Sequence, residues 1–174
     1  FIIVFYYILY NQILYEYLFI GLSLFVIGYL DDIKLELSPN LRLIFMIIFL
    51  LFFINNLSIK IDNLDLIFLK TWLENKIFSN IFILICFLFI INGSNLIDGF
   101  NGLLSINLII VNSVLLFINL NNNHIEFSFF LTGQIIILVA FLLFNFPRAK
   151  IFLGDSGSYL LGSLIALNVI YTNN

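Results

Sequence analysis

The chain has 174 residues, of which 63% are hydrophobic and only 10% are charged, and its formal net charge is −3. A soluble domain is normally about half apolar and about a quarter charged. This composition excludes a soluble enzyme, a secreted domain and a disordered chain, and the negative net charge argues against a nucleic-acid partner. We therefore expect the chain to lie in a membrane.

Apolar blocks alternate with short polar breaks along the whole chain. About 20 helical residues cross a bilayer, and backbone polar groups in hydrocarbon must be satisfied within the segment, which favours helices. The sequence therefore predicts an all-α, polytopic transmembrane bundle with about six spans, built as one integral-membrane domain over residues 1–174. The apolar blocks are 1–10 (the tail of a span), 17–30, 41–57, 77–91, 103–120, 125–144 and 157–171.

Three of the polar breaks contain Asp, the second and third of them together with Asn and Gly, and two apolar blocks separate each break from the next. An even number of crossings returns the chain to the same side, so the three breaks are expected to face one compartment. The other breaks are Asn-rich loops with dispersed charge, expected on the opposite side. The motif side carries four Lys and Arg residues and the other side carries three, so the positive-inside rule favours a cytoplasmic motif face only weakly. The three motif breaks are 29–34, 92–102 and 145–158.

Acidic residues in these breaks are candidates for chemistry. Like charges on one membrane face repel each other unless a cation lies among them, and oxygen ligands without His or Cys suit Mg²⁺ or Mn²⁺. Gly154 precedes an apolar block, where the N–H groups at a helix start fit a phosphate. The pattern predicts a metal-dependent reaction on a phosphorylated substrate at the membrane surface. The acids concerned are Asp31, Asp32, Asp98 and Asp155.

The order and the residue patterns of these segments resemble the motifs of one superfamily. It is the polyprenyl-phosphate N-acetylhexosamine-1-phosphate transferases, the glycosyltransferase family 4 group with WecA-like and MraY-like branches. The resemblance runs from about residue 17 to residue 171. It is carried by Asp31-Asp32 with the downstream Leu37-Ser-Pro-Asn-Leu-Arg42, by Asn92-x-x-Asn-Leu-Ile-Asp-Gly-x-Asn-Gly-Leu103, and by Asn145-Phe-Pro-x-Ala-Lys-Ile-Phe-Leu-Gly-Asp-Ser-Gly-Ser158.

The resemblance implies a bundle of about ten spans in the bacterial inner membrane, with the active site on the cytoplasmic face. It implies transfer of a sugar 1-phosphate, such as N-acetylhexosamine 1-phosphate, from a UDP-sugar to undecaprenyl or another polyprenyl phosphate. UMP is released, and lipid-linked cell-envelope glycans such as O-antigen are initiated. The implied cofactor is Mg²⁺, with Mn²⁺ as the alternative, and a homodimer is left open. We interpret the chain as a fragment, truncated at both ends relative to this family.

Residue roles follow from the resemblance alone. Asp155 and Asp32 match metal ligands, and Asp31 and Asp32 lie beside the lipid phosphate, with Asp31 the candidate base. Phe152 matches an aromatic that stacks on uracil, whereas Arg148 and Lys150 are either phosphate contacts or positive-inside anchors. Position 101 is Asn where many relatives carry Asp. The predicted substrate-binding residues are Asn95, Asp98, Asn101, Asn145, Arg148, Lys150 and Phe152.

Two alternatives to the main interpretation stay open. The residue pattern of 149–158 favours the WecA-like branch. The alternative within the family is an MraY-type phospho-N-acetylmuramoyl-pentapeptide transferase of peptidoglycan synthesis. The alternative from another class is a cation-coupled transporter whose acids bind ions. A transporter is expected to place charge at mid-span, and the predicted span interiors are nearly uncharged.

Overall fold

The structure is a computed structural model that describes residues 2–10, 14–33, 38–57, 59–61 and 67–173. Lys34 and Leu37 of the motif segments lie outside the described residues. Within the described ranges all regular structure is helical, which confirms the predicted all-α membrane bundle. The helices are α1 (Ile2–Tyr10), α2 (Tyr15–Asp32), α3 (Pro39–Asn56), α4 (Ile67–Leu73), α5 (Lys76–Asp98), α6 (Leu103–Asn121), α7 (Ile125–Asn145) and α8 (Gly154–Asn173).

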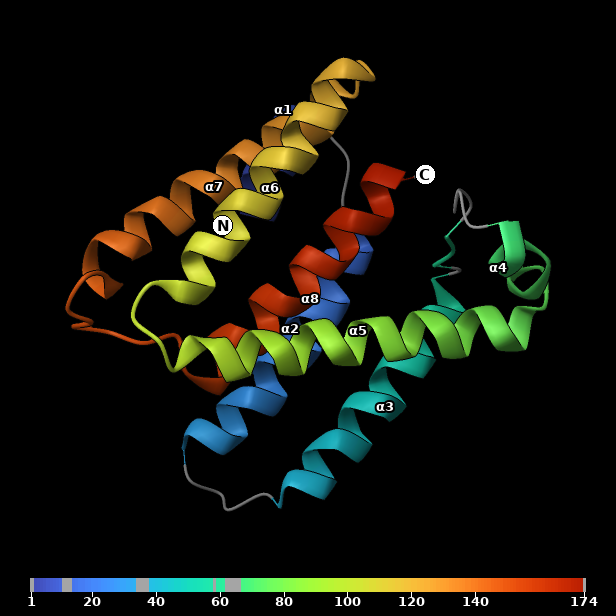
Figure 1. Cartoon of the computed structure of the whole chain (residues 1–174), viewed down its shortest axis with the longest axis horizontal. Helices are drawn as coiled ribbons and strands as arrows, with labels where there is room; N and C mark the ends of the chain where they lie inside the picture. Colours follow the sequence, from blue (N-terminus) through green and yellow to red (C-terminus); the bar gives the residue numbers. More distant parts are fainter. Residues whose placement is uncertain (1, 11–13, 34–37, 58, 62–66, 174) are drawn as a thin grey trace.

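Helices α2 and α8 lie side by side at the centre of the bundle (Figure 1). Helix α5 packs on α8, α3 packs on both α2 and α5, and α6 and α7 form a pair on the other side. Four described helices (α3, α5, α6 and α7) are long and apolar enough to cross a membrane. The central pair is less apolar because it carries acidic ends and buried polar side chains.

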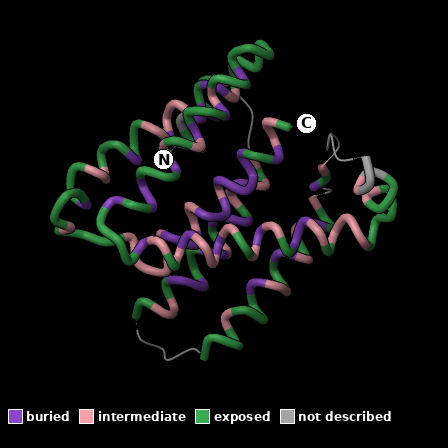
Figure 2. The backbone as a smooth tube through the Cα atoms, in the orientation of Figure 1, coloured by how far each residue is buried: buried purple, intermediate pink, exposed green. Residues whose placement is uncertain are grey.

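The surrounding helices have exposed faces, as the green segments of α5, α6 and α7 show (Figure 2), and many of the exposed side chains are large and apolar. Phe89 is 77% exposed and Phe117 64%. A soluble protein rarely leaves such large apolar surfaces open to water, whereas lipid tails solvate them at no cost. Helix α8 is the most buried, with Ser158, Ser163, Leu167 and Asn168 fully enclosed.

A buried amide network joins four helices in the interior. The Tyr17 hydroxyl of α2 donates a hydrogen bond to Asn168 Oδ1 of α8, at 2.9 Å. The Asn168 amide donates to Asn112 Oδ1 of α6 and to Gln134 Oε1 of α7, both at 2.8 Å. Buried polar groups are costly unless they are paired, so the network stabilises one mutual arrangement of these helices.

Gly162 allows α8 to approach α5 closely. A Cβ atom at this position would lie 2.9 Å from the Ile91 Cα and the Ser94 Oγ of α5. Such distances are shorter than normal van der Waals contacts, so a larger side chain would push the two helices apart. Gly162 therefore has a packing role, as small residues often do between membrane helices.

Candidate active site

The four predicted acids come together at one end of the bundle. Asp31 and Asp32 end α2, Asp98 ends α5, and Asp155 lies in the first turn of α8. Asp31 and Asp155 bind the same Arg42 nitrogen, and Asp32 accepts a hydrogen bond from the Asp155 N–H. Asp98 interacts electrostatically with Asp32. The even number of crossings between the motif segments therefore returned them to one end, as the sequence predicted.

A glycine brings the two central helices together at this end. A Cβ atom at Gly28 would lie 2.5 Å from the backbone oxygen of Asp155 and from the Cα of Ser156. Only a residue without a side chain fits there, because the obstacle is backbone and cannot rotate away. Gly28 thus lets the last turn of α2 touch the first turn of α8.

Arg42 is the residue that sequence reasoning missed. Ser38 caps α3 by accepting a hydrogen bond from the Leu41 N–H, and Pro39 starts the helix, which places Arg42 in its first turn. The Arg42 Nη1 atom donates to Asp31 Oδ2 and to Asp155 Oδ2, both at 2.5 Å. The signal was available, since Arg42 stands in one of the motif segments just after a Ser-Pro helix start.

Asp32 faces the backbone of α8. Its Oδ1 accepts a hydrogen bond from the Asp155 N–H and its Oδ2 accepts one from the Ser156 N–H, each at 3.0 Å. Partial burial raises the pKa of Asp32, but the hydrogen bonds from Ser156 and Asp155 outweigh this and hold the pKa below its ordinary value. The N–H groups expected to bind a phosphate therefore bind a carboxylate of the protein itself.

Asp155 has a different environment. Burial and the neighbouring Asp31 raise the pKa of Asp155 above its ordinary value, although the Arg42 guanidinium opposes this. The Tyr159 hydroxyl, one turn further along α8, donates to Asp155 Oδ2 at 3.4 Å. A second cation beside Asp155 would therefore stabilise its ionised form.

Three of the predicted substrate-binding amides make contacts within the protein. Buried Asn145 accepts a hydrogen bond from the Gly102 N–H at 2.6 Å and donates to the Ile151 carbonyl at 2.7 Å. Asn95 accepts from Ser158 Oγ at 3.1 Å and donates to the Tyr159 hydroxyl at 3.3 Å. Asn101, which is exposed, donates to the Pro147 carbonyl. These bonds fix the segments around the acids, and the roles of the amides in substrate binding stay predictions.

The remaining predicted residues lie on the segment between α7 and α8. Phe152 is 55% exposed, and Arg148 and Lys150 are also exposed. Asp98, by contrast, is buried, and its carboxylate interacts with the backbone N–H groups of Leu153 and Gly154. The geometry leaves Phe152 accessible to a ligand beside the acids, and its stacking role stays a prediction.

The arrangement of the acids bears on whether they fit Mg²⁺. Within the described residues no three His, Cys, Asp or Glu side chains are grouped closely enough to hold a metal ion by themselves. Asp31 and Asp155 nevertheless converge on one cationic nitrogen, each through one oxygen. Mg²⁺ is commonly held by one or two carboxylates together with substrate phosphates and water, so this pair fits the ion. The predicted role of Asp32 as a ligand stays a prediction.

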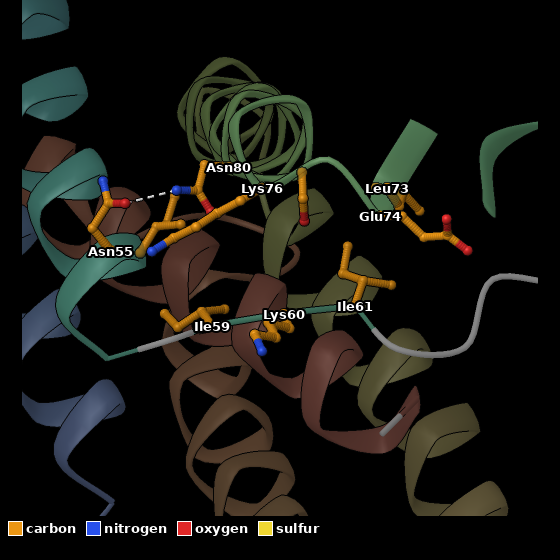
Figure 3. A pocket seen from close by; sticks show the side chains of 10 residues that line it. Asn55, Ile59, Lys60, Ile61, Leu73, Glu74, Lys76 and Asn80 are labelled. Carbon is orange, nitrogen blue, oxygen red and sulfur yellow. Dashed lines mark hydrogen bonds between the residues drawn. The ribbon is translucent and has the colours of Figure 1, made fainter. Parts of the chain in front are cut away.

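A hollow lies at the ends of α3 and α5 that are remote from the acids (Figure 3). Its volume is about 390 Å³, and the Asn80 amide donates to Asn55 Oδ1 on its wall at 2.7 Å. Lys60, Lys76 and Glu74 also line it. None of the predicted site residues lies there, so this hollow is separate from the acid cluster.

The fold and the site together define an integral membrane protein with carboxylates and an arginine gathered at one end of its bundle. Residues 14–173 match the sequence profile of glycosyl transferase family 4. Because this match covers most of the chain, the protein belongs to that family, as the motif resemblance predicted.

Similar proteins from three bacteria all bear the name phospho-N-acetylmuramoyl-pentapeptide-transferase. The chain is 48% identical to that of Leuconostoc mesenteroides over 81 residues, 45% of this chain and 25% of the relative. It is 33% identical to that of Listeria monocytogenes serotype 4b over 162 residues, 86% of this chain and 49% of the relative. It is 30% identical to that of Bacillus subtilis over 171 residues, which are 89% of this chain and 51% of the relative.

These relatives correct the choice of branch. They carry the name of the MraY-type enzyme, which was the alternative, and so they support that alternative better than the WecA-like main interpretation. The residue pattern of 149–158 therefore did not discriminate between the two branches. In the longer matches, the chain spans about half the length of the relatives.

Proposed function

We propose that the protein is an MraY-type transferase that moves phospho-N-acetylmuramoyl-pentapeptide from UDP-N-acetylmuramoyl-pentapeptide to a polyprenyl phosphate and releases UMP. The names of the relatives support the sugar, and the motif resemblance supports UDP and the lipid acceptor. The observation that carries the proposal is the convergence of Asp31 and Asp155 on Arg42 at one end of a membrane bundle.

The proposed reaction joins two anions. An oxygen of the lipid phosphate forms a bond to the phosphorus of the sugar phosphate, and the bond from that phosphorus to the UMP oxygen breaks. Such transfers depend mostly on positioning and on neutralising charge. A phosphate monoester is already largely ionised at pH 7, so we expect Asp31 to orient the acceptor and keep it deprotonated.

The need to neutralise charge suggests roles for the other residues of the site. In this proposal Asp155 and Asp31 would hold Mg²⁺, which would supply positive charge beside the two phosphates. Arg42 holds these two carboxylates together through one nitrogen, Nη1. Phe152 would stack on uracil, and Arg148 and Lys150 would contact the diphosphate. We propose that this end of the bundle faces the cytoplasm, where UDP-sugars are found, and that the lipid acceptor enters from the bilayer.

The test is a UMP-release assay of the purified native gene product with MgCl₂, undecaprenyl phosphate and two donors, UDP-N-acetylmuramoyl-pentapeptide and UDP-N-acetylglucosamine. We expect release with the pentapeptide donor only, and its loss in Asp155→Asn. Glu74→Gln, at the opposite end of the bundle, is the control and should keep wild-type turnover. Release with UDP-N-acetylglucosamine alone would restore the WecA-like interpretation, and no release with either donor would overturn the proposal.

A further inference from the structure

The first turn of α8 is held by a carboxylate from α2. The first four N–H groups of a helix have no partner within the helix and must find one elsewhere. At α8, Asp32 accepts from the N–H groups of Asp155 and Ser156, at 3.0 Å each. Asp98 interacts with the next two groups towards the N-terminus, those of Leu153 and Gly154.

Two glycines make this arrangement sterically possible. Gly154 adopts a left-handed conformation with φ of +69°, and a Cβ atom there would lie 2.9 Å from both Asp32 oxygens. Gly28, one turn before Asp32, is the point where the α2 backbone touches the α8 backbone. The backbone on both sides of the carboxylate is therefore shaped to let Asp32 reach the helix end.

Adjacent carboxylates thus point at different partners. Successive residues of a helix are about 100° apart around its axis, so Asp31 and Asp32 cannot face the same group. Asp31 is bound to Arg42, which also holds Asp155, whereas Asp32 is bound to the α8 backbone. The side chain of Asp155 is therefore fixed from one side by Arg42, and its main chain from the other side by Asp32.

We propose that Asp32 is a positioning residue, which caps α8 and so sets the place of Asp155 beside Asp31 and Arg42. This inference rests on the function proposed above, and it assigns Asp32 a role other than direct contact with the metal or the lipid phosphate. Asp32→Asn tests this role with a small change in shape. The amide keeps one acceptor oxygen, but its NH₂ group faces a backbone N–H and cannot accept from it. Asp31→Asn is the matched control, because the neighbouring carboxylate does not touch α8 amides.

The cap itself is tested by hydrogen–deuterium exchange on the native gene product without metal or substrate. In Asp32→Asn, the amides of Asp155 and Ser156 should exchange about tenfold faster than in wild type, the size expected for a lost helix cap. In Asp31→Asn their exchange should stay within about twofold of wild type. Unchanged exchange in Asp32→Asn, or equal acceleration in both variants, overturns the capping role.

The consequence for the reaction is tested by UMP release over a range of MgCl₂ concentrations. A positioning role predicts that Asp32→Asn lowers kcat about tenfold while the half-saturating Mg²⁺ concentration stays within about threefold. A metal ligand predicts instead a large rise in that concentration, and such a rise overturns the proposal. If the wild-type protein releases no UMP while the exchange results are as expected, the proposed function fails and the cap stands.

A second pair of variants leaves Asp32 intact. Gly28→Ala pushes against the Asp155 backbone. Gly21→Ala, two turns earlier on the same face, meets only the ends of two flexible side chains, Leu160 at 3.0 Å and Leu164 at 3.8 Å. Gly28→Ala should reproduce the faster exchange at Asp155 and the lower kcat, and Gly21→Ala should show neither. Wild-type exchange and turnover in a folded Gly28→Ala protein would contradict the inference.

Discussion

Arg42 is the group whose removal most directly tests how the site is assembled. A single nitrogen, Nη1, donates to both Asp31 Oδ2 and Asp155 Oδ2. Arg42→Leu removes both contacts and leaves two carboxylates facing each other. Arg42→Lys keeps a positive charge, and an ammonium group has three donors on one nitrogen, so it is able to serve the same two oxygens.

The expected magnitude follows from burial. A hydrogen bond to a charged group is worth about 1.5–3 kcal/mol when its loss leaves a buried partner, but exposed ion pairs contribute only about 0–1 kcal/mol. The three side chains are 20–26% exposed, so we place the loss between these limits, at about 2 kcal/mol for the two contacts together. If this loss falls on the transition state, kcat/KM decreases about 30-fold.

The assay is UMP release under subsaturating donor, with folding checked by the thermal melting of each variant. Arg42→Leu should lose about 30-fold in kcat/KM, whereas Arg42→Lys should stay within about threefold of wild type. Lys76→Leu, at the opposite end of the bundle, should leave kcat/KM unchanged. A folded Arg42→Leu protein with nearly wild-type kcat/KM would refute the reasoning, and an equal loss in Arg42→Lys would show that guanidinium geometry matters more than charge.

Three further predictions concern packing and the exposed aromatic. Gly162→Ala should lower the free energy of unfolding by about 1–3 kcal/mol because of overpacking, whereas Gly93→Ala, where a Cβ atom meets nothing within 4 Å, should raise it by about 0.5–1 kcal/mol. Asn168→Leu should lower the free energy of unfolding by about 1–3 kcal/mol in an unfolding titration, because three buried polar partners lose their hydrogen bonds. An unchanged free energy of unfolding would show that water or the lipid replaces these bonds. Phe152→Ala should raise KM for the UDP-linked donor several-fold with little change in kcat, and the control Phe100→Ala, at a phenylalanine that is 65% exposed, should leave KM unchanged.

The fold could be predicted from the sequence because lipid imposes a simple rule. The predicted block 125–144 corresponds to α7 (Ile125–Asn145), and 103–120 to α6 (Leu103–Asn121). The predicted block 77–91 ends too early, because α5 continues through the polar residues to Asp98. Hydropathy falls after residue 91, but the helix continues, because its last turns pack against α8 and their polar groups find partners there.

The partners of each acid were not predictable in the same way. Counting crossings indicates which helix ends share a face, but the rotation of each helix decides what a side chain touches. Arg42 was passed over because a lone base near a membrane end is usually an anchor. The choice of branch was wrong for another reason, since the motifs that carry the resemblance do not by themselves separate the WecA-like from the MraY-like branch.

The central helix pair is fixed at both ends, and this bears on how Asp155 keeps its place. At one end Tyr17 is bound to Asn168, and at the other Asp32 is bound to the Asp155 and Ser156 amides. The attachment points lie 15 residues apart on α2 and 13 on α8, or about 22 and 20 Å at 1.5 Å per residue. Two helices tied at both ends cannot slide or rotate independently, and misplacement by about 1 Å is enough to cost a hundredfold in rate. The buried amides, although remote from the chemistry, therefore set the register in which the capped helix end presents Asp155.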